Sequence, residues 1–346
     1  MDIYVYNKNF EKIGTPVDFY TSTILCTRFI ECGDFEIYIE ATKKTVELLA
    51  IDNFISKQDS EIMYLIEAVE MEKDEEKGAF LSVKGRCLKA LLARRIIWNQ
   101  TNLDGTVEDC IRQLVTENAI SPSDISRKIP LLTLGERHGW TETMQMQVTG
   151  DNLLEKTIEI CTSYNYGFDI LFRNNQLVFE LCKGVDRSKG QEVNQRVIFN
   201  ENYDNLLTSQ YSFNSTGFAN VALVHGEGEG TRTKTNSYGS SEGLERREIY
   251  VDGSNISTNS GGINAEKYLV LLAEKGKEAL AEAINEESVS ADVLIDGVFK
   301  YGRDFALGDI VTIETSYGLE KDTRIMEVTE SYNESGKYEV EIRLNL

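Results

Sequence analysis

The sequence predicts an α+β, β-rich protein of several domains, in which two β-barrel-like domains at the ends of the chain enclose an α+β insertion. The chain has 346 residues, more than one hydrophobic core usually spans, so several smaller cores are expected. Strand-like alternation dominates residues 1–86 and 309–344, whereas helical periodicity falls mainly between them. Hydrophobic residues make up 41% of the chain, enough apolar surface to offset the entropy of ordering it.

Residues 1–98 predict an N-terminal β-barrel-like domain with a closing helix. Apolar and polar residues alternate in residues 3–6 and 35–39, which is the period of a half-buried strand. Residues 62–72 predict a longer strand, and the charged residues 73–78 predict a hairpin turn whose charge keeps the strand edges soluble. A further strand then passes into the closing helix. The apolar face expected for this helix consists of Leu88, Leu91, Leu92 and Ile96.

Residues 99–195 predict the α+β insertion. Thr106 is a suitable helix N-cap, with Asp109 at the third position after it. A second helix is expected from about residue 151, and a hairpin that turns at Asn174-Asn175 should pack on it. The residues expected to be buried are Val107, Ile111, Leu114 and Val115 in the first helix, Leu154, Ile158 and Cys161 in the second, and Phe168, Ile170, Phe172, Leu177, Phe179 and Leu181 in the hairpin.

The last two predicted regions are residues 196–262 and 263–346. The first has returning strands at residues 197–199 and 221–224, followed by a polar glycine- and serine-rich loop or linker from residue 226. The second combines a helix with the C-terminal β-barrel-like domain. We expect this helix at residues 265–286 and strands at residues 289–295, 309–314, 324–331 and 338–344. Tyr338, Val340, Ile342 and Leu344 of the last strand should share one face.

The charge of the chain argues against stable nucleic-acid binding. Lysine and arginine number 36 against 57 aspartate and glutamate residues, a formal net charge of −21, and such a field repels phosphate backbones. The basic clusters Lys43-Lys44, Arg94-Arg95 and Arg246-Arg247 are too short to form a basic stripe. An acidic wall would, however, let DNA slide past without adhering.

Cysteine spacing and the N-terminal pattern predict synthesis in a reducing cytoplasm. The start of the chain lacks the pattern of a signal peptide. No run approaches the roughly 18 apolar residues of a membrane span, so no stable membrane insertion is expected. The cysteines have neither disulfide-framework nor zinc-site spacing, and we expect buried free thiols. They are Cys26, Cys32, Cys87, Cys110, Cys161 and Cys182.

The sequence offers no motif for catalysis, a metal or a cofactor, and none is expected. His138 and His225 are the two histidines, and neither belongs to a recognisable constellation. Residues 239–243 match G-x-S-x-G but lack the required strand before and helix after, and no histidine follows them. The glutamates of residues 226–230 would repel a phosphate, so this segment is interpreted as an acidic turn. A glycosidase-like carboxylate pair stays open, because its geometry cannot be seen in a sequence.

The order of the predicted elements resembles that of the tail-tip or baseplate hub proteins of tailed bacteriophages, the Tal-like prophage tail protein family. The resemblance covers nearly the whole chain and depends on the order and spacing of several passages. These are residues 83–92 (VKGRCLKALL), residues 220–230 (NVALVHGEGEG) with Arg232, Leu307-Gly308-Asp309-Ile310-Val311 within residues 301–314, and Arg324-Ile325-Met326-Glu327-Val328.

The resemblance implies a structural protein of the virion tail tip and not an enzyme. Three subunits with two β-barrel-like domains each would present six similar modules to a sixfold tail tube, close it, and open for DNA passage on host contact. Gly308-Asp309 would be a structural turn before a barrel strand. The implied partners are two further copies of the chain, the distal tail protein ring, the tape-measure protein and a tail fibre or receptor-binding protein. Since the chain stops on an expected barrel strand, no cell-wall-degrading extension is expected.

Two competing functions stay open at this point. A tail-associated cell-wall hydrolase would act through carboxylates, and it would clear cell walls in solution. A carbohydrate-binding adhesin would present clustered exposed aromatic residues. The candidates for such a cluster are Tyr4, Tyr6, Tyr164, Tyr166 and Tyr238, of which we expect the first four to pack in the interior.

Overall fold

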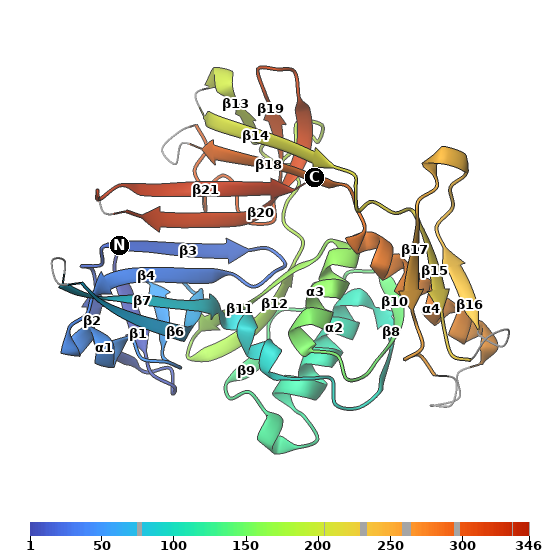
Figure 1. The fold of residues 1–346 in the computed structure, drawn as a ribbon, viewed down its shortest axis with the longest axis horizontal. Coiled ribbons are helices and arrows are strands. Elements are labelled where there is room, and N and C mark those ends of the chain that lie inside the picture. Colours follow the sequence, from blue (N-terminus) through green and yellow to red (C-terminus); the bar gives the residue numbers. More distant parts are fainter. Residues whose placement is uncertain are drawn as a thin grey trace.

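The computed structural model describes residues 1–74, 78–203, 205–228, 234–257, 264–293, 298–333 and 335–345. Strands from the two ends of the chain form one continuous sheet, an α+β layer packs against it, and a smaller module stands to one side (Figure 1). We call these parts the N-terminal module, the C-terminal module, the α+β module and the α4 module. None of the described helices is long and apolar enough to cross a membrane.

The N-terminal module is a curled, barrel-like antiparallel sheet with one short helix. Its strands are β1 (Ile3–Tyr6), β2 (Lys12–Val17), β3 (Ser22–Arg28), β4 (Asp34–Glu40), β5 (Phe54–Lys57), β6 (Met63–Asp74) and β7 (Gly78–Cys87), and its helix is α1 (Lys43–Leu48). The strands follow the spatial order β3-β4-β7-β6-β5-β1-β2. The alternation predicted in β1 and β4 is confirmed, since Ile3, Val5, Phe35, Ile37 and Ile39 are all buried in one core. The predicted hairpin turn lies at residues 75–77, outside the described residues.

The helix predicted to close the N-terminal region is a 3-10 helix, η1 (Leu88–Arg94), and not an α-helix. Leu88, Leu91 and Leu92 are buried as expected. Leu88 and Leu91 are three positions apart and therefore eclipse on a 3-10 helix, as do Lys89 and Leu92, which are also both buried. Burial of Ile96 was a wrong prediction. This residue follows the end of the helix and is 44% exposed, whereas its neighbour Ile97 is buried.

The α+β module confirms the predicted helix start and hairpin. Its elements are β8 (Thr101–Thr106), α2 (Val107–Val115), η2 (Thr116–Ile120), η3 (Ile125–Arg127), β9 (Leu132–Leu134), β10 (Thr143–Val148), α3 (Leu153–Tyr164), β11 (Gly167–Arg173) and β12 (Gln176–Cys182). The Thr106 hydroxyl accepts the backbone N–H of Asp109 at 3.1 Å, which caps α2. Asn174 and Asn175 both have positive φ, as a two-residue type I′ hairpin turn requires. Of the residues expected to be buried here, Ile158 and Phe172 are half-buried and the others lie in the core.

The C-terminal module is a second barrel-like β module. Its elements are β13 (Ile198–Asn200), η4 (Glu201–Tyr203), β14 (Leu206–Asn214), β18 (Glu286–Val293), β19 (Ile310–Glu314), β20 (Glu320–Tyr332) and β21 (Tyr338–Asn345). The order β14-β18-β21-β20 is antiparallel throughout, while β13 runs parallel to β19. Val340, Ile342 and Leu344 are buried as the alternation predicts, but Tyr338 at the start of β21 is 39% exposed.

The α4 module replaces much of the polar loop predicted after residue 226. It contains β15 (Val221–His225), β16 (Thr235–Tyr238), η6 (Gly243–Glu245), β17 (Glu248–Asp252) and α4 (Ala265–Glu282). Strands β16 and β17 pair with the two edges of β15, so a pure loop is a wrong prediction for the described part of this stretch. Helix α4 ends at Glu282, before the predicted residue 286. Gly276 lets α4 lie close to the sheet, because a Cβ atom there would be 2.9 Å from that of Tyr238.

The two β-rich ends of the chain meet edge to edge. Strand β20 pairs antiparallel with β3, from Glu327 opposite Arg28 to Tyr332 opposite Thr23. An ion pair between Arg28 Nε and Glu327 Oε2, at 2.5 Å, lies across the same pair of strands. This pairing places the two barrel-like modules in tandem within one sheet (Figure 1). The pairing of β14 with β18 also crosses the boundary expected at residue 262.

Candidate functional site

Phe29 lies where the N-terminal, α+β and C-terminal modules meet. Its N–H donates to the carbonyl of Met326 at 2.9 Å, and its own carbonyl accepts the N–H of Phe168 at 3.3 Å. The ring is buried between two glycines, and a Cβ atom on Gly167 or Gly308 would lie 2.2 or 2.3 Å from ring atom Cε2. The Arg324 guanidinium lies 5.2 Å from the ring centroid. One side chain therefore joins three modules, and two of its neighbours have to be glycine.

Lys89 holds the loop before β4 against the same junction. Its ammonium group donates to the carbonyls of Arg28, Phe29 and Glu31 at 2.7, 3.4 and 3.0 Å. The residue is 1% exposed, and the ammonium also lies 4.8 Å from the ring centroid of Phe168. A buried ammonium with three acceptors satisfies its hydrogen-bonding capacity. Lys89 therefore fixes the backbone that presents Phe29.

Asp309 ties the segment that follows β12 to the C-terminal module. Its carboxylate is 3% exposed and pairs with Arg187 Nε at 2.7 Å. It also accepts the backbone N–H groups of Val185 at 2.8 Å and Ala306 at 3.0 Å. The preceding Gly308 has φ +91°. These contacts use the carboxylate as an internal hydrogen-bond acceptor, in agreement with the structural turn that the resemblance implied.

The two histidines and the buried Glu108 form structural contacts. His138 Nε2 lies 2.9 Å from the carbonyl oxygen of Leu181, and the His138 ring stacks on Trp140. The carboxylate of Glu108 accepts the N–H groups of residues 138, 139 and 140. Burial raises the pKa of Glu108, but these hydrogen bonds outweigh it and leave the pKa below its ordinary value. His225 lies in another module, beside Tyr250. No group of three metal-binding side chains occurs among the described residues.

The described residues of the two sequence motifs considered for nucleophile or phosphate chemistry lie in connections of the α4 module. Residues 239–243 form the exposed connection from β16 to η6, without a strand-to-helix elbow. Glu227 pairs with Lys234 at 2.6 Å, and residues 229 and 230 of the predicted acidic turn are outside the described residues. Neither described segment has the geometry that its motif requires.

Several clefts are lined by carboxylates, and in one of them most of these carboxylates already have partners. This cleft has a volume of about 540 Å³ and lies between β3, β18, β20 and β21. Glu327 pairs with Arg28 at 2.5 Å, and Glu287 with Lys321 at 3.6 Å. Glu286 accepts the side-chain amide of Asn214 at 2.9 Å. These ion pairs and hydrogen bonds occupy the carboxylates that a glycosidase would need to leave free for acid and base roles.

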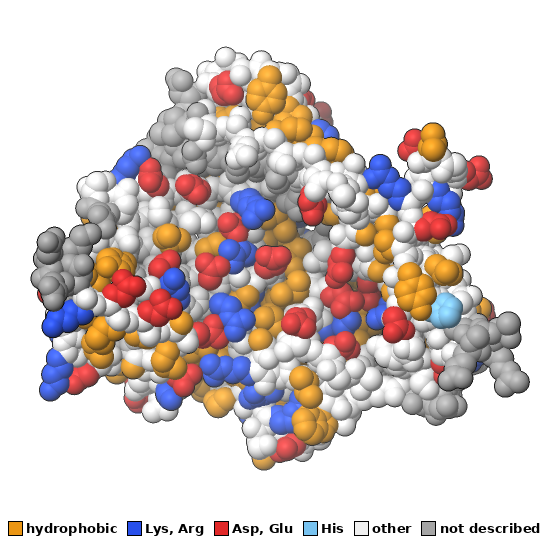
Figure 2. Space-filling model, in the orientation of Figure 1, with side chains coloured by type: hydrophobic (Ala, Val, Ile, Leu, Met, Phe, Trp, Pro, Cys, Tyr) orange, Lys and Arg blue, Asp and Glu red, His pale blue; other side chains and the backbone are white. Residues whose placement is uncertain are grey.

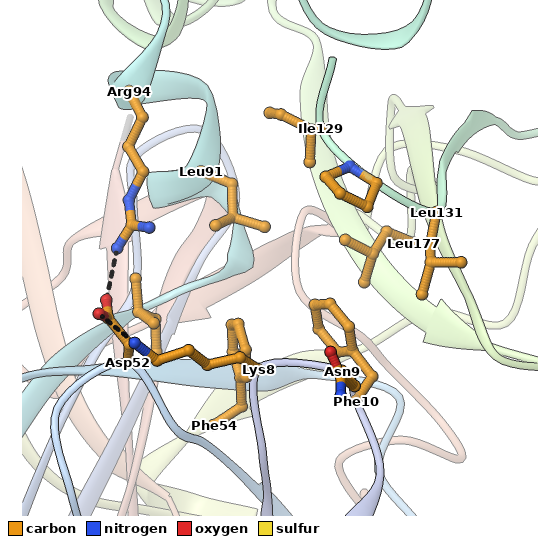
Figure 3. A pocket seen from close by; sticks show the side chains of 12 residues that line it. Lys8, Asn9, Phe10, Asp52, Phe54, Leu91, Arg94, Ile129, Leu131 and Leu177 are labelled. Atoms are coloured by element: carbon orange, nitrogen blue, oxygen red, sulfur yellow. Dashed lines mark hydrogen bonds and ion pairs between the residues drawn. The ribbon is translucent and has the colours of Figure 1, made fainter. Parts of the chain in front are cut away.

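A second cavity lies between the N-terminal and α+β modules and is mainly apolar (Figure 3). Its volume is about 460 Å³, and it is lined by the turn after β1, by η1 and by residues 129–131. At its edge, Asp52 pairs with Lys8 at 3.1 Å and with Arg94 at 3.4 Å. Sequence reasoning missed this cavity, because its walls come from segments more than 100 positions apart.

Surface charge and aromatic residues favour neither a nucleic-acid site nor a sugar platform. Figure 2 shows acidic and basic side chains interspersed on the face seen in Figure 1, with acidic ones gathered near the contact of α3 and α4. The tyrosines considered for an adhesin are spread over three modules. Tyr166 is buried, Tyr4, Tyr6 and Tyr164 are half-buried, and Tyr238 is 37% exposed. The expected packing of the first four is thus confirmed in full for Tyr166 and in part for the others.

The cysteines are free thiols, and four of the six are buried as expected. The expectation of burial is wrong for Cys182, which is exposed, and for Cys32, which is half-buried. Cys32 lies 3.5 Å from Cys87, measured between their sulfur atoms, although they are 55 positions apart. Its hydrogen bond with Cys87 lowers the pKa of Cys32, while burial raises the pKa of Cys87.

Comparison with solved structures places this fold among phage tail proteins. The tail protein from Neisseria meningitidis MC58 is similar with a TM-score of 0.61 and 15% identity, over 100% of this chain and 96% of that one. The 43 kDa tail protein of prophage MuSo2 from Shewanella oneidensis has a TM-score of 0.61 and 13% identity, over 99% of this chain and 98% of that one. Prophage tail protein gp18 from Listeria monocytogenes EGD-e has a TM-score of 0.57 and 12% identity, over 100% of this chain and 94% of that one.

The sequence itself gives a family assignment. None of the curated proteins matches the chain. The profile of one family matches residues 2–344, which is nearly the whole chain. The expected resemblance to phage tail proteins is thereby confirmed for both fold and family. The chain belongs to the Siphovirus ReqiPepy6 Gp37-like protein family.

Proposed function

We propose that this protein is a structural component of a phage or prophage tail, where three copies form the hub at the tail tip. The observation that carries the proposal is the tandem arrangement of two barrel-like β modules, joined edge to edge by β3 and β20. The fold that this chain shares with three tail proteins over its whole length supports the same role. Membership of a siphovirus protein family agrees with it.

The module arrangement suits a change of symmetry between a trimer and a tail tube. Two similar modules in each of three copies would present six modules around a central passage, which matches a sixfold ring of tail protein. Closed cyclic symmetry of this kind requires the same interface to repeat between successive copies. The distal tail protein ring, the tape-measure protein and a tail fibre or receptor-binding protein are the partners that this position implies. We also propose that each described module folds as a unit around its own core.

The proposed work is mechanical and not enzymatic. The junction residues Phe29, Lys89 and Asp309 use their polar groups for contacts within the protein. The carboxylates of the cleft between β3, β18, β20 and β21 are mostly paired. A net charge of −21 would let DNA move through the passage without adhering to its wall.

Two assays on the purified full-length chain test this proposal. Light scattering should give the mass of three copies, about three times 39.1 kDa, and imaging should show a three-lobed ring. The same protein should release nothing from purified cell walls. A stable monomer at all concentrations would contradict the hub, and clearing of cell walls would support the hydrolase instead.

A further inference from the structure

One leucine is fully exposed at a projecting end of the molecule. Leu244 lies in η6, in the connection between β16 and β17, and its exposed fraction is 101%. This connection projects from the end of the molecule opposite to the N-terminal module (Figure 1). Glu242 and Glu245 flank the leucine, and neither forms an ion pair among the described residues, whereas Arg246 pairs with Glu248 at 2.5 Å. The tip is thus an apolar side chain between two unpaired carboxylates.

Two residues that line the cavity between the N-terminal and α+β modules have an unfavourable backbone conformation. Phe10 has φ +62° and Leu131 has φ +64°, a region that bulky side chains rarely adopt. In the described part of the chain, every other non-glycine residue with positive φ is an aspartate or asparagine. Phe10 and Leu131 both line this cavity, and Leu131 is 43% exposed (Figure 3). Strain of this kind is typical of sites where a protein binds something.

The charges at the cavity edge complement those of the tip. Lys8 and Arg94 share one carboxylate, that of Asp52, so the edge carries an excess positive charge. Leu91 and Ile129 extend the apolar wall inward from this edge. An apolar cavity with a positive edge suits an apolar side chain flanked by carboxylates.

We propose that Leu244 of one copy enters this cavity on the next copy, with Glu242 and Glu245 facing Lys8 and Arg94. This inference rests on the proposed function, in which several copies assemble, and it identifies a contact between successive copies. The tip and the cavity are different surfaces on different modules of the chain, so the contact is head-to-tail. A head-to-tail contact generates a closed ring when its rotation closes.

A photo-cross-linking amino acid at position 244 of the full-length chain tests the contact. Cross-links should join two chains and map to residues 8–10 or 129–131 of the second. The matched control carries the same amino acid at position 193, because Val193 is also highly exposed, at 91%, but lies in the segment between β12 and β13. This control should give no cross-link to the cavity.

Substitutions give an independent readout of the same contact. Leu244→Glu should raise the dissociation constant of the assembly by at least about tenfold, the worth of burying one leucine side chain, whereas Val193→Glu should not. Glu245→Lys should weaken assembly, and Lys8→Glu in the same chain should partly restore it. Circular dichroism should be unchanged in each variant, because these side chains are exposed.

The outcomes separate this inference from the proposed function. Assembly that is unaffected by Leu244→Glu, with cross-links only to other surfaces, overturns the Leu244 contact and leaves the hub in place. A chain that stays monomeric at every concentration overturns both. Cross-links to the cavity with loss of assembly in Leu244→Glu support both.

Discussion

The ring of Phe29 lies so close to Gly308 that a single added methyl group would overlap it. A Cβ atom on Gly308 would be 2.3 Å from Cε2 of Phe29 and 2.5 Å from Cδ2. Phe29 belongs to the N-terminal module and Gly308 to the C-terminal module, and they meet beside the pairing of β3 with β20. This contact sets how closely the two barrel-like modules approach one another.

Gly308→Ala should destabilise the protein by about 3 kcal/mol, because an alanine there adds overpacking to the cost of a positive φ. Gly318→Ala is the matched control, since Gly318 has a similar φ of +86° but no atom near its missing Cβ. The control should cost only about 1 kcal/mol. Denaturant titration of both variants measures the difference. Equal losses would show that the contact with Phe29 does not limit the approach of the modules.

Asp309→Ala should destabilise the protein by about 3–5 kcal/mol, because it leaves the partly buried Arg187 and two backbone N–H groups without their acceptor. Asp186→Ala is the control. Asp186 is an exposed acid on the same segment that accepts one N–H, from Ser188. Hydrogen exchange of residues 183–189 should rise in the first variant and stay near the original value in the second. An unchanged exchange rate in Asp309→Ala would refute the tie between the modules.

The contact of α3 with α4 should have a pH optimum and should weaken as the pH rises above it. Burial, with the adjacent charge of Glu159, raises the pKa of Glu278 well above its ordinary value. Burial also raises the pKa of Glu159, but a hydrogen bond with Glu278 and the charge of Lys156 leave it lowered. A group whose pKa is raised in the folded state stabilises that state at low pH, and this stabilisation is lost as the pH rises through the raised pKa. A group whose pKa is lowered stabilises the folded state at higher pH, and this stabilisation is lost as the pH falls through the lowered pKa. The contact should therefore be most stable between the two values.

Hydrogen exchange of α4, corrected for intrinsic rates, measures this pH dependence. Protection should fall on the alkaline side in the original protein, and Glu278→Gln should remove most of this fall because it keeps the hydrogen-bonding shape without the titration. Glu282→Gln, at an exposed position of the same helix, is the control and should leave the fall in place. If protection of α4 falls equally at alkaline pH in Glu278→Gln, a group other than Glu278 causes the fall.

Oxidation should join Cys32 to Cys87. The lowered pKa of Cys32 favours its thiolate, and the partner sulfur is 3.5 Å away, so a small shift would reach disulfide distance. Diamide would accept the two hydrogen atoms that the thiols lose. In a Cys182→Ser background, mass spectrometry of proteolytic fragments should show one linked pair, and Cys32→Ser should abolish it. Two thiols that both remain alkylatable after diamide would contradict this expectation.

Local signals in the sequence predicted the elements that depend on a few neighbouring residues. Thr106 caps a helix because its hydroxyl reaches the N–H three residues on, and Asn174-Asn175 turns a hairpin because asparagine tolerates positive φ. The alternation in β1 and β4 likewise identified buried faces. These features require no knowledge of the rest of the chain.

Features that depend on distant partners could not be predicted in the same way. Strands β16 and β17 are short, and both pair with β15, which supplies the buried face. Ile96 fits a helical period but follows the end of a tighter 3-10 helix. The amino-acid composition does not predict the positive φ of Phe10 and Leu131, so the cavity that they line could not be predicted from the sequence. No sequence pattern revealed the Phe29 junction, because its glycines come from two other modules.

A three-dimensional reconstruction of the assembled full-length chain by electron microscopy would show whether the two β modules alternate around a passage. We expect three copies in a ring, with N-terminal and C-terminal β modules alternating as six lobes around an open passage. A ring in which one kind of module alone surrounds the passage, or particles of a single copy, would contradict it.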